Sequence, residues 1–165
     1  MKECCNARLD PAAVAAMKYP EGIDIAWVAS DAQGNLGVFI TAGVGPIAMP
    51  AMRFLDEELQ CPEEMIAKLP EGGGSDLLMD APDTSSYSRM ADRGFYVFDW
   101  TDVYATDGFL EKYELVATPR NPARTADLPP ELSSACEATK FADINFAATT
   151  DVDPASEFEC VQPDE

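Results

Sequence analysis

Carboxylates are the side chains of this sequence that could carry chemistry, and they are densest between residues 56 and 64. Five acidic residues fall there: Asp56, Glu57, Glu58, Glu63 and Glu64. Two carboxylates can serve as general acid and base when a low-dielectric pocket separates their pKa values. These five are predicted to lie on the polar face of one helix and in the first turn of the next, in contact with water. We therefore interpret them as a solvated face or a partner-binding patch.

A second candidate site is the tryptophan that lies between two carboxylates, in the segment Asp99-Trp100-Thr101-Asp102. Tryptophan is enriched at the centres of protein interfaces, so Asp99, Trp100 and Asp102 form a candidate anchor for a partner. The alternative is a core tryptophan followed by a polar turn.

Nothing else in the sequence indicates an active site. The sequence contains no histidine, which removes the commonest general base and metal ligand. Its five cysteines are scattered, and no CxxC pair occurs among them. We expect no metal, no cofactor and no enzymatic activity, although an enzyme that works through carboxylates alone stays open as an alternative.

Two short motifs resemble ligand sites but are better explained as turns. Residues 43–46 (GVGP) lack the lysine of a phosphate loop, and glycine there would allow a positive φ after a strand. Asp31, Gln33 and Asn35 flank Gly34 like calcium ligands, but the downstream glutamate is out of register. A hairpin turn accounts for them.

The composition points to a basic protein partner. The 165 residues include 30 Asp and Glu but 11 Lys and Arg, giving a net charge of −19. Such a chain repels nucleic acid and anionic membranes and attracts basic surfaces. The amino-terminal residues do not resemble a signal peptide, and no apolar stretch approaches the roughly 18 residues of a membrane helix. We expect a cytoplasmic protein.

The elements that must position these residues follow from periodicity and turn signals. Helices are predicted at residues 11–18, 51–61, 62–69, 85–94 and 129–137. Strands are predicted at residues 23–30, 36–41, 77–79, 95–100, 110–118 and 140–147, and a loop at 42–50. The pairs 23–30 with 36–41 and 95–100 with 110–118 are predicted to be hairpins. We expect an α+β fold with an antiparallel sheet of hairpins and short helices packed on it.

The domain organisation follows from the charge of the last residues. Residues 1–148 would form a single domain. Residues 149–165 hold six acidic residues and no basic one, and they would form an acidic and partly disordered tail.

One stretch carries a resemblance to a known group of proteins. Residues 25–46 (IAWVASDAQGNLGVFITAGVGP) combine a tryptophan, an Asp- and Gly-containing turn, a Phe-x-Thr strand end and a final Gly-x-Gly-Pro. This pattern resembles an opening found in small acidic bacterial immunity proteins that are encoded beside polymorphic toxins. The resemblance implies a cytoplasmic protein that binds a toxin domain and blocks it, and it implies no catalytic residues.

Composition and resemblance together give the leading hypothesis, an immunity protein of bacterial competition that occludes a basic surface or active site of its cognate toxin. Residues 56–64 would speed association, and the 99–102 segment would slow dissociation. Two alternatives remain: a carboxylate-based small-molecule enzyme and an acidic regulatory module that binds a basic protein. The enzyme requires a deep pocket with at least two carboxylates, one of them buried.

Overall fold

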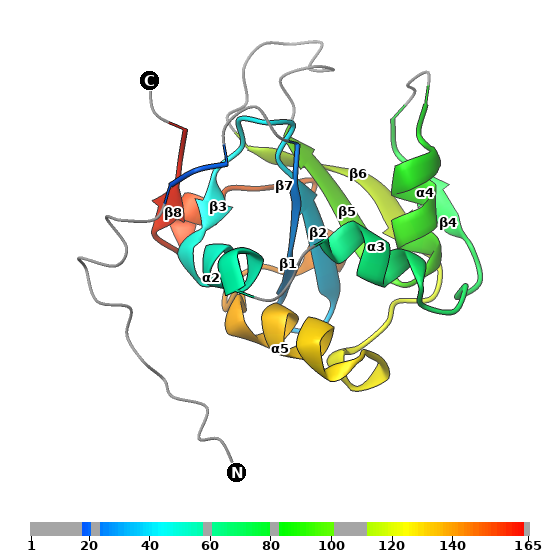
Figure 1. Ribbon diagram of the computed structural model, residues 1–165. Coiled ribbons are helices and arrows are strands. Elements are labelled where there is room, and N and C mark those ends of the chain that lie inside the picture. Colours follow the sequence, from blue (N-terminus) through cyan, green and yellow to red (C-terminus); the bar gives the residue numbers. More distant parts are fainter. Residues whose placement is uncertain (1–17, 21–23, 58–60, 80–82, 101–111, 164–165) are drawn as a thin grey trace.

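A curled, mostly antiparallel sheet forms the centre of the protein, whose computed structural model describes residues 18–20, 24–57, 61–79, 83–100 and 112–163 (Figure 1). The sheet runs in the order β1-β2-β5-β6-β4, with β7 paired to β6, and only β2 and β5 run parallel to each other. Its strands are β1 (Ala26–Ser30), β2 (Leu36–Ile40), β4 (Ser75–Leu77), β5 (Phe95–Trp100), β6 (Tyr113–Pro119) and β7 (Asp151–Val152). The predicted α+β fold, with a single domain and a mostly antiparallel sheet, is confirmed.

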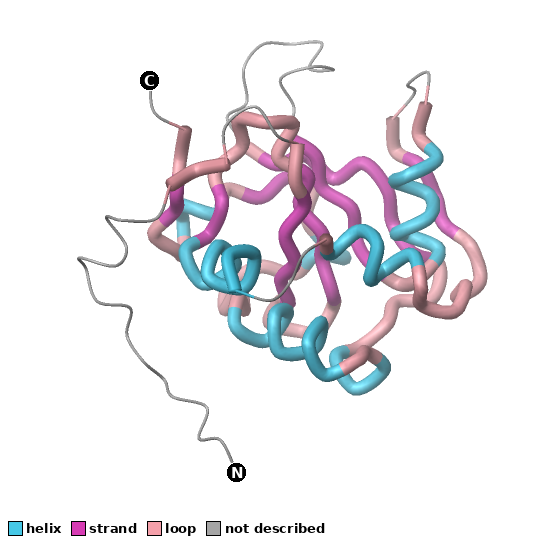
Figure 2. Tube along the Cα trace, in the orientation of Figure 1, coloured by secondary structure: helices cyan, strands magenta, loops and turns pink. Residues whose placement is uncertain are grey.

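Short helices and a two-stranded ribbon surround this sheet (Figure 2). The helices are α2 (Met49–Glu57), α3 (Pro62–Ala67), α4 (Ser85–Asp92) and α5 (Pro130–Ala138). Three single 3₁₀ turns are η1 (Thr125–Asp127), η2 (Phe146–Ala148) and η3 (Pro154–Ser156). The ribbon pairs β3 (Ile47–Ala48) with β8 (Cys160–Val161). In the described part of the chain, every helix is too short or too polar to cross a membrane.

The first hairpin is confirmed, and its turn is held by Asp31. Strands β1 and β2 pair antiparallel, from Ala26 opposite Ile40 to Ser30 opposite Leu36. The Oδ1 atom of Asp31 accepts hydrogen bonds from the backbone N–H groups of Gln33 (2.9 Å) and Asn35 (2.8 Å). Gly34 has φ +82°, a conformation that favours glycine.

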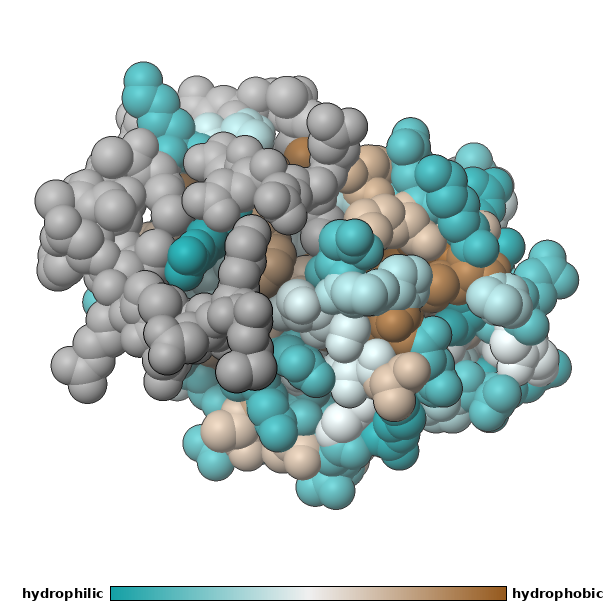
Figure 3. Space-filling view, turned by 60° about the horizontal axis from the view of Figure 1, so that its bottom comes forward, coloured by the Kyte–Doolittle hydropathy of each residue, from teal (hydrophilic) through white to brown (hydrophobic). Residues whose placement is uncertain are grey.

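Consecutive residues of each strand point to opposite faces of the sheet, and both faces are buried. On one face, Val28, Val38 and Val97 pack under α3, α4 and α5. On the other face, Trp27, Phe39 and Phe98 pack against β3, β8 and the carboxyl-terminal segment. Helix α2 contributes side chains to both cores. Seen from below, hydrophilic side chains cover most of the described surface, with apolar ones gathered towards the right (Figure 3).

Aromatic rings stack across three neighbouring strands in the second of these cores. Trp27 lies opposite Phe39, which lies opposite Phe98. The ring centroids are 4.3 Å apart for the first pair and 4.7 Å for the second, and both pairs are nearly parallel. A Cβ atom on Gly37 would lie 2.8 Å from the ring of Phe146, so glycine is needed for this ring to pack on the sheet.

The hydroxyl of Tyr113 ties this core to the loop at residues 42–46. It donates a hydrogen bond to the carbonyl of Pro46 (2.8 Å) and accepts one from Nε1 of Trp27 (3.2 Å). A Cβ atom on Gly45 would lie 2.6 Å from this hydroxyl, and Gly43 has φ +81°. Gly43 therefore serves the turn that the sequence predicted, and Gly45 serves a close packing contact that it did not predict.

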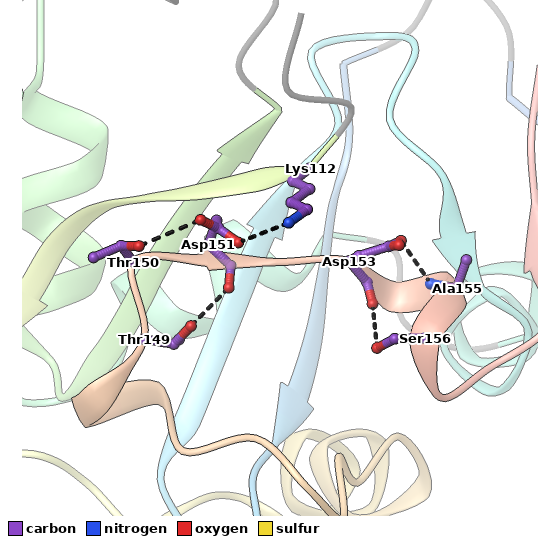
Figure 4. Close-up of polar contacts among 7 residues, drawn as sticks. All are labelled: Lys112, Thr149, Thr150, Asp151, Asp153, Ala155 and Ser156. Carbon is purple, nitrogen blue, oxygen red and sulfur yellow. Dashed lines mark hydrogen bonds and ion pairs between the residues drawn. The ribbon is translucent and has the colours of Figure 1, made fainter.

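The carboxyl-terminal segment is part of the fold, so the prediction of a solvated tail is wrong for residues 149–163. Strand β7 pairs with β6, β8 pairs with β3, and Val152 and Val161 are buried. Its acidic residues make local contacts (Figure 4): Asp151 forms an ion pair with Lys112 (3.5 Å), and Asp153 caps η3 through the N–H of Ala155 (3.0 Å).

Other boundaries differ from the sequence prediction. Residues 42–50 were predicted to be a loop, but they contain β3 and the first turn of α2. The predicted last strand at residues 140–147 is wrong: Lys140 makes one isolated bridge to Ser30, and the chain then forms η2. The strand predicted at 77–79 lies at 75–77. The helix predicted at 11–18 falls almost wholly outside the described residues.

Candidate functional site

The most unusual polar side chain of the described structure is the carboxylate of Asp99, near the end of β5. Only 7 % of this residue is exposed. It lies opposite Ile40 on β2 and Glu114 on β6, in the row of side chains that continues the helix-covered core. An acidic residue therefore occupies a position at which the sheet pattern would place an apolar one.

One oxygen of this carboxylate has a partner and the other does not. The hydroxyl of Tyr87, on α4, donates a hydrogen bond to Oδ2 of Asp99. The buried Oδ1 has no hydrogen-bond partner among the described residues. A buried acceptor without a donor is costly, and a buried negative charge more so.

Burial raises the pKa of Asp99 to about 6, and the negative charges of Asp24 and Glu114 add to this effect, while the Tyr87 hydrogen bond opposes it. Near pH 6 the group is therefore half protonated. At pH 7 it is mostly ionised, and positive charge nearby would stabilise this form.

Asp24 is an acidic residue whose charge acts on Asp99 and on Glu63. It lies just before β1 and is exposed, and its Oδ1 accepts a hydrogen bond from the N–H of Ala42 (2.9 Å). Burial is the main cause of the raised pKa values of Asp99, of Glu63 on α3 and of Tyr19, and the negative charge of Asp24 raises each of them further. Four carboxylates from four parts of the chain thus share one end of the sheet, and we call Asp24, Glu63, Asp99 and Glu114 the β5-end cluster.

Of the predicted acidic patch at 56–64, only Glu63 belongs to the β5-end cluster. Glu63 and Glu64 occupy the first turn of α3, as predicted, with Glu63 half-buried and Glu64 exposed. Burial raises the pKa of Glu63, and Asp24 raises it further. Of the remaining predicted residues, Asp56 and Glu57 lie in the last turn of α2, and Glu58 lies outside the described residues.

The predicted anchor at 99–102 separates into two environments. Asp99 belongs to the β5-end cluster, whereas the partly buried ring of Trp100 packs edge-on against Tyr113, with centroids 5.1 Å apart. Trp100 thus contacts the aromatic core on the opposite face of the sheet. Asp102 lies outside the described residues.

Three residues of the site were missed by sequence reasoning: Asp24, Tyr87 and Glu114. Glu114 could have been found, because the predicted hairpin of 95–100 with 110–118 places it near Asp99 on the same face. Asp24 and Tyr87 carry no local signal, since they reach Asp99 through tertiary packing of distant segments.

Two ion pairs join described residues, and neither includes the β5-end cluster. Lys112 pairs with Asp151 at 3.5 Å and Arg120 with Asp76 at 2.9 Å. The cluster therefore presents negative charge that no cation among the described residues neutralises through an ion pair.

The motifs that resembled ligand sites are used for the fold. All hydrogen bonds accepted by Asp31 come from the protein itself, including one from the backbone N–H of Phe146 (2.7 Å). No group of three or more Cys, Asp or Glu side chains in the described segments is arranged to hold a metal ion. Burial raises the pKa of the Cys136 thiol strongly and that of Cys160 to about 12, so both are weakly reactive.

A small hollow lies between β1 and the helices α2, α3 and α5. Apolar side chains, with Trp27 and Phe54 the largest, form its lining. It lacks the paired carboxylates that a carboxylate-based active site requires.

Comparison with known proteins adds no family assignment. The chain matches no protein-family model, and no match was found among curated proteins or solved structures.

Proposed function

We propose that this protein is a cytoplasmic immunity protein of bacterial competition, which binds a cognate basic toxin domain and occludes a surface or active site of that domain. The proposal concerns binding and requires no catalytic residue, cofactor or metal. The β5-end cluster and the neighbouring Glu64 are the proposed binding region. It includes three residues predicted from the sequence, Glu63, Glu64 and Asp99.

The overall charge supports this proposal. Many toxins that act on nucleic acids or nucleotides carry basic clefts, and a protein of net charge −19 mimics the anionic substrate. Opposite charges speed the encounter of two proteins, and like charges suppress binding to the wrong partners.

The observation that carries the proposal is the buried carboxylate of Asp99, whose Oδ1 has no hydrogen-bond partner among the described residues. A buried acceptor without a donor, with like charges nearby, lowers the stability of the isolated protein. A cationic surface placed over Asp24, Glu64 and Glu114 would lower the energy of that buried charge. Asp99 itself is too deeply buried to touch the partner. It contributes to binding through the negative electrostatic potential that its charge adds to the surface.

The experiment is co-expression with the product of the gene immediately upstream, scored by growth rescue and by pull-down of a complex. The informative variant is Asp99→Asn, which removes the buried charge while keeping the shape and an acceptor for Tyr87. We expect Asp99→Asn to weaken the complex at least tenfold although it stabilises the free protein, which separates a binding defect from unfolding. Measured affinity equal to that of the wild type would remove Asp99 from the proposal.

Glu137→Gln is the matched control, because it also removes one negative charge. Glu137 is exposed on α5. The adjacent residue, Cys136, accepts a hydrogen bond at its carbonyl from Ser30, which lies at the end of β1 opposite to the β5-end cluster. We expect Glu137→Gln to change the affinity less than twofold. Absence of both growth rescue and a complex with the wild-type protein would contradict the proposed function.

A second candidate function, a carboxylate-based enzyme, is favoured by one observation. A buried carboxyl with pKa about 6 beside other carboxylates is the arrangement that acid–base catalysis uses. Growth rescue without a stable complex would support an enzyme that reverses the toxin's modification. The third candidate, a regulatory module, differs only in its basic partner, and the absence of a toxin gene upstream would favour it.

A further inference from the structure

Strand β4 forms an open edge of the six-stranded sheet, whereas the opposite edge is covered. At the β1 edge, the N–H of Ser30 donates to the carbonyl of Thr139 (3.0 Å), and the N–H of Phe141 donates to the carbonyl of Ser30 (2.9 Å). Helices α2, α3 and α5 pack against β1, and helix α4 packs against β4. At the other end of the sheet order, β4 pairs with β6 on one side only, and no strand among the described residues pairs with its other side.

The register of β4 shows which backbone groups face the open side. The carbonyl of Gly74 accepts from the N–H of Arg120 (3.1 Å), and the N–H of Leu78 donates to the carbonyl of Val116 (2.8 Å). Because hydrogen bonding alternates along an antiparallel strand, the intervening Ser75 and Leu77 present their N–H and C=O groups outward. These groups are a template for a further strand.

The side chains of this edge are unusually apolar for an unprotected strand. Leu77 and Leu78 are 42 % and 56 % exposed, and with Val44 they are the large hydrophobic residues most exposed in the described structure. Edge strands are commonly protected by Lys or Pro, and β4 contains neither. Its one charged residue, Asp76, is paired with Arg120.

The charge of the residues around β4 indicates which kind of partner would bind there. The described residues of this stretch, 71–79 and 83, include three acidic residues and no basic one, and one of the three, Asp76, is paired with Arg120. Pairing of β4 with a second copy would bring two such segments together on proteins that each carry a net charge of −19. An extended segment rich in Lys or Arg complements both this charge and the open backbone groups.

We infer that β4 accepts an extended, basic segment of the partner, which adds to the sheet as its next strand. This inference rests on the proposed function, because the segment belongs to the toxin domain. Main-chain hydrogen bonds to Ser75 and Leu77 provide affinity, and the side chains of Leu77 and Leu78 provide apolar contact. The β4 edge is a contact separate from the β5-end cluster, so the two can be tested separately.

The test uses the full chain and an inactive variant of the upstream toxin domain. Leu77→Pro removes the outward N–H, and an edge strand tolerates proline where that N–H faces solvent. Val44→Ala is the matched control, because Val44 is exposed to 43 %, as Leu77 is to 42 %. We expect Leu77→Pro to weaken the complex at least tenfold and Val44→Ala less than twofold. Hydrogen exchange at the Ser75 and Leu77 amides of the wild-type protein should slow at least tenfold on binding.

The outcomes separate this inference from the proposed function. If a complex forms but the Ser75 and Leu77 amides exchange at the free rate, the inference is overturned and the proposed function stands. If the wild-type protein forms no complex, both fail. Slowed exchange at these amides that depends on the concentration of the free protein would show a second copy as the occupant and would also overturn the inference. If Leu77→Pro fails to fold, the hydrogen exchange of the wild-type complex decides.

Discussion

Among the described side chains, Tyr87 alone donates a hydrogen bond to the carboxylate of Asp99, and it reaches Oδ2 from α4 across the end of β5. The hydrogen bond stabilises the ionised form of Asp99, while burial and the charges of Asp24 and Glu114 destabilise it more. The balance leaves a destabilised negative charge inside the fold.

Asp99→Asn should stabilise the isolated protein at pH 7.5. The pKa of Asp99 is raised in the folded state from 3.8 to about 6, so its contribution to stability is full below pH 3.8 and is lost as the pH rises through about 6. Asparagine does not ionise, and we expect a gain of about 1–3 kcal/mol at pH 7.5 that vanishes near pH 4. Urea unfolding at several pH values measures this difference.

The control for this titration is Asp76→Asn. The pKa of the exposed Asp76 is lowered, first by its hydrogen bond from Arg120, so the change should not stabilise the protein at pH 7.5. A pH-independent difference between Asp99→Asn and the wild type would contradict the burial of a titrating group at this position.

Tyr113→Phe should destabilise the fold by about 2–4 kcal/mol, because it leaves two buried partners unsatisfied. The hydroxyl of Tyr113 accepts from Trp27 and donates to the carbonyl of Pro46. Tyr96→Phe is the control, since Tyr96 is a buried tyrosine of the same core without a described hydrogen bond from its hydroxyl. Equal midpoints of chemical unfolding for the two variants would show that the Tyr113 hydroxyl contributes nothing.

Val161→Asp tests whether the carboxyl-terminal segment belongs to the fold. Val161 is buried in β8, whereas the adjacent Gln162 is exposed. Burying an unpaired carboxylate should cost about 3 kcal/mol or more, and Gln162→Asp should change stability by less than about 0.5 kcal/mol. Thermal unfolding compares the two, and identical midpoints would restore the view of this segment as a solvated tail.

Charge reversal on α3 should slow association with the toxin domain. Glu63→Lys combined with Glu64→Lys removes negative potential beside Asp24 and should lower the association rate constant several-fold at low salt. The double change Glu131→Lys and Glu137→Lys on α5 alters the net charge equally, and we expect a smaller effect. Stopped-flow measurements distinguish the two, and equal slowing would mean that total charge matters more than its position.

Local signals explain how much of the fold could be predicted. The hairpin around Gly34 was predicted because an Asp-to-Asn turn separates two β-branched runs, and β5 was predicted because aromatic and valine residues alternate. The parallel pairing of β2 with β5 could not be predicted, because it joins segments separated by β3, α2, α3, β4 and α4. The carboxyl-terminal segment was misread because its charge outweighs two isolated core residues, Val152 and Val161.

The site was partly predictable for the same reason. Glu63 was selected because it belongs to the densest acidic cluster of the sequence, and Asp99 because it flanks Trp100 at the end of a predicted strand. Their common neighbour Asp24 was not selected, since a single aspartate before a strand has no distinguishing pattern. The missing information is tertiary: β1, α3 and β5 meet at one end of the sheet only after the chain has folded.

The most direct test of the account is the salt dependence of the association rate constant between the wild-type protein and the toxin domain. Uncompensated carboxylates that attract a cationic surface should give a rate constant that falls about tenfold or more between 20 mM and 300 mM salt, with a nearly constant dissociation rate. An association rate constant that stays the same across this range would contradict the claim that the negative surface of this protein attracts and binds a basic partner.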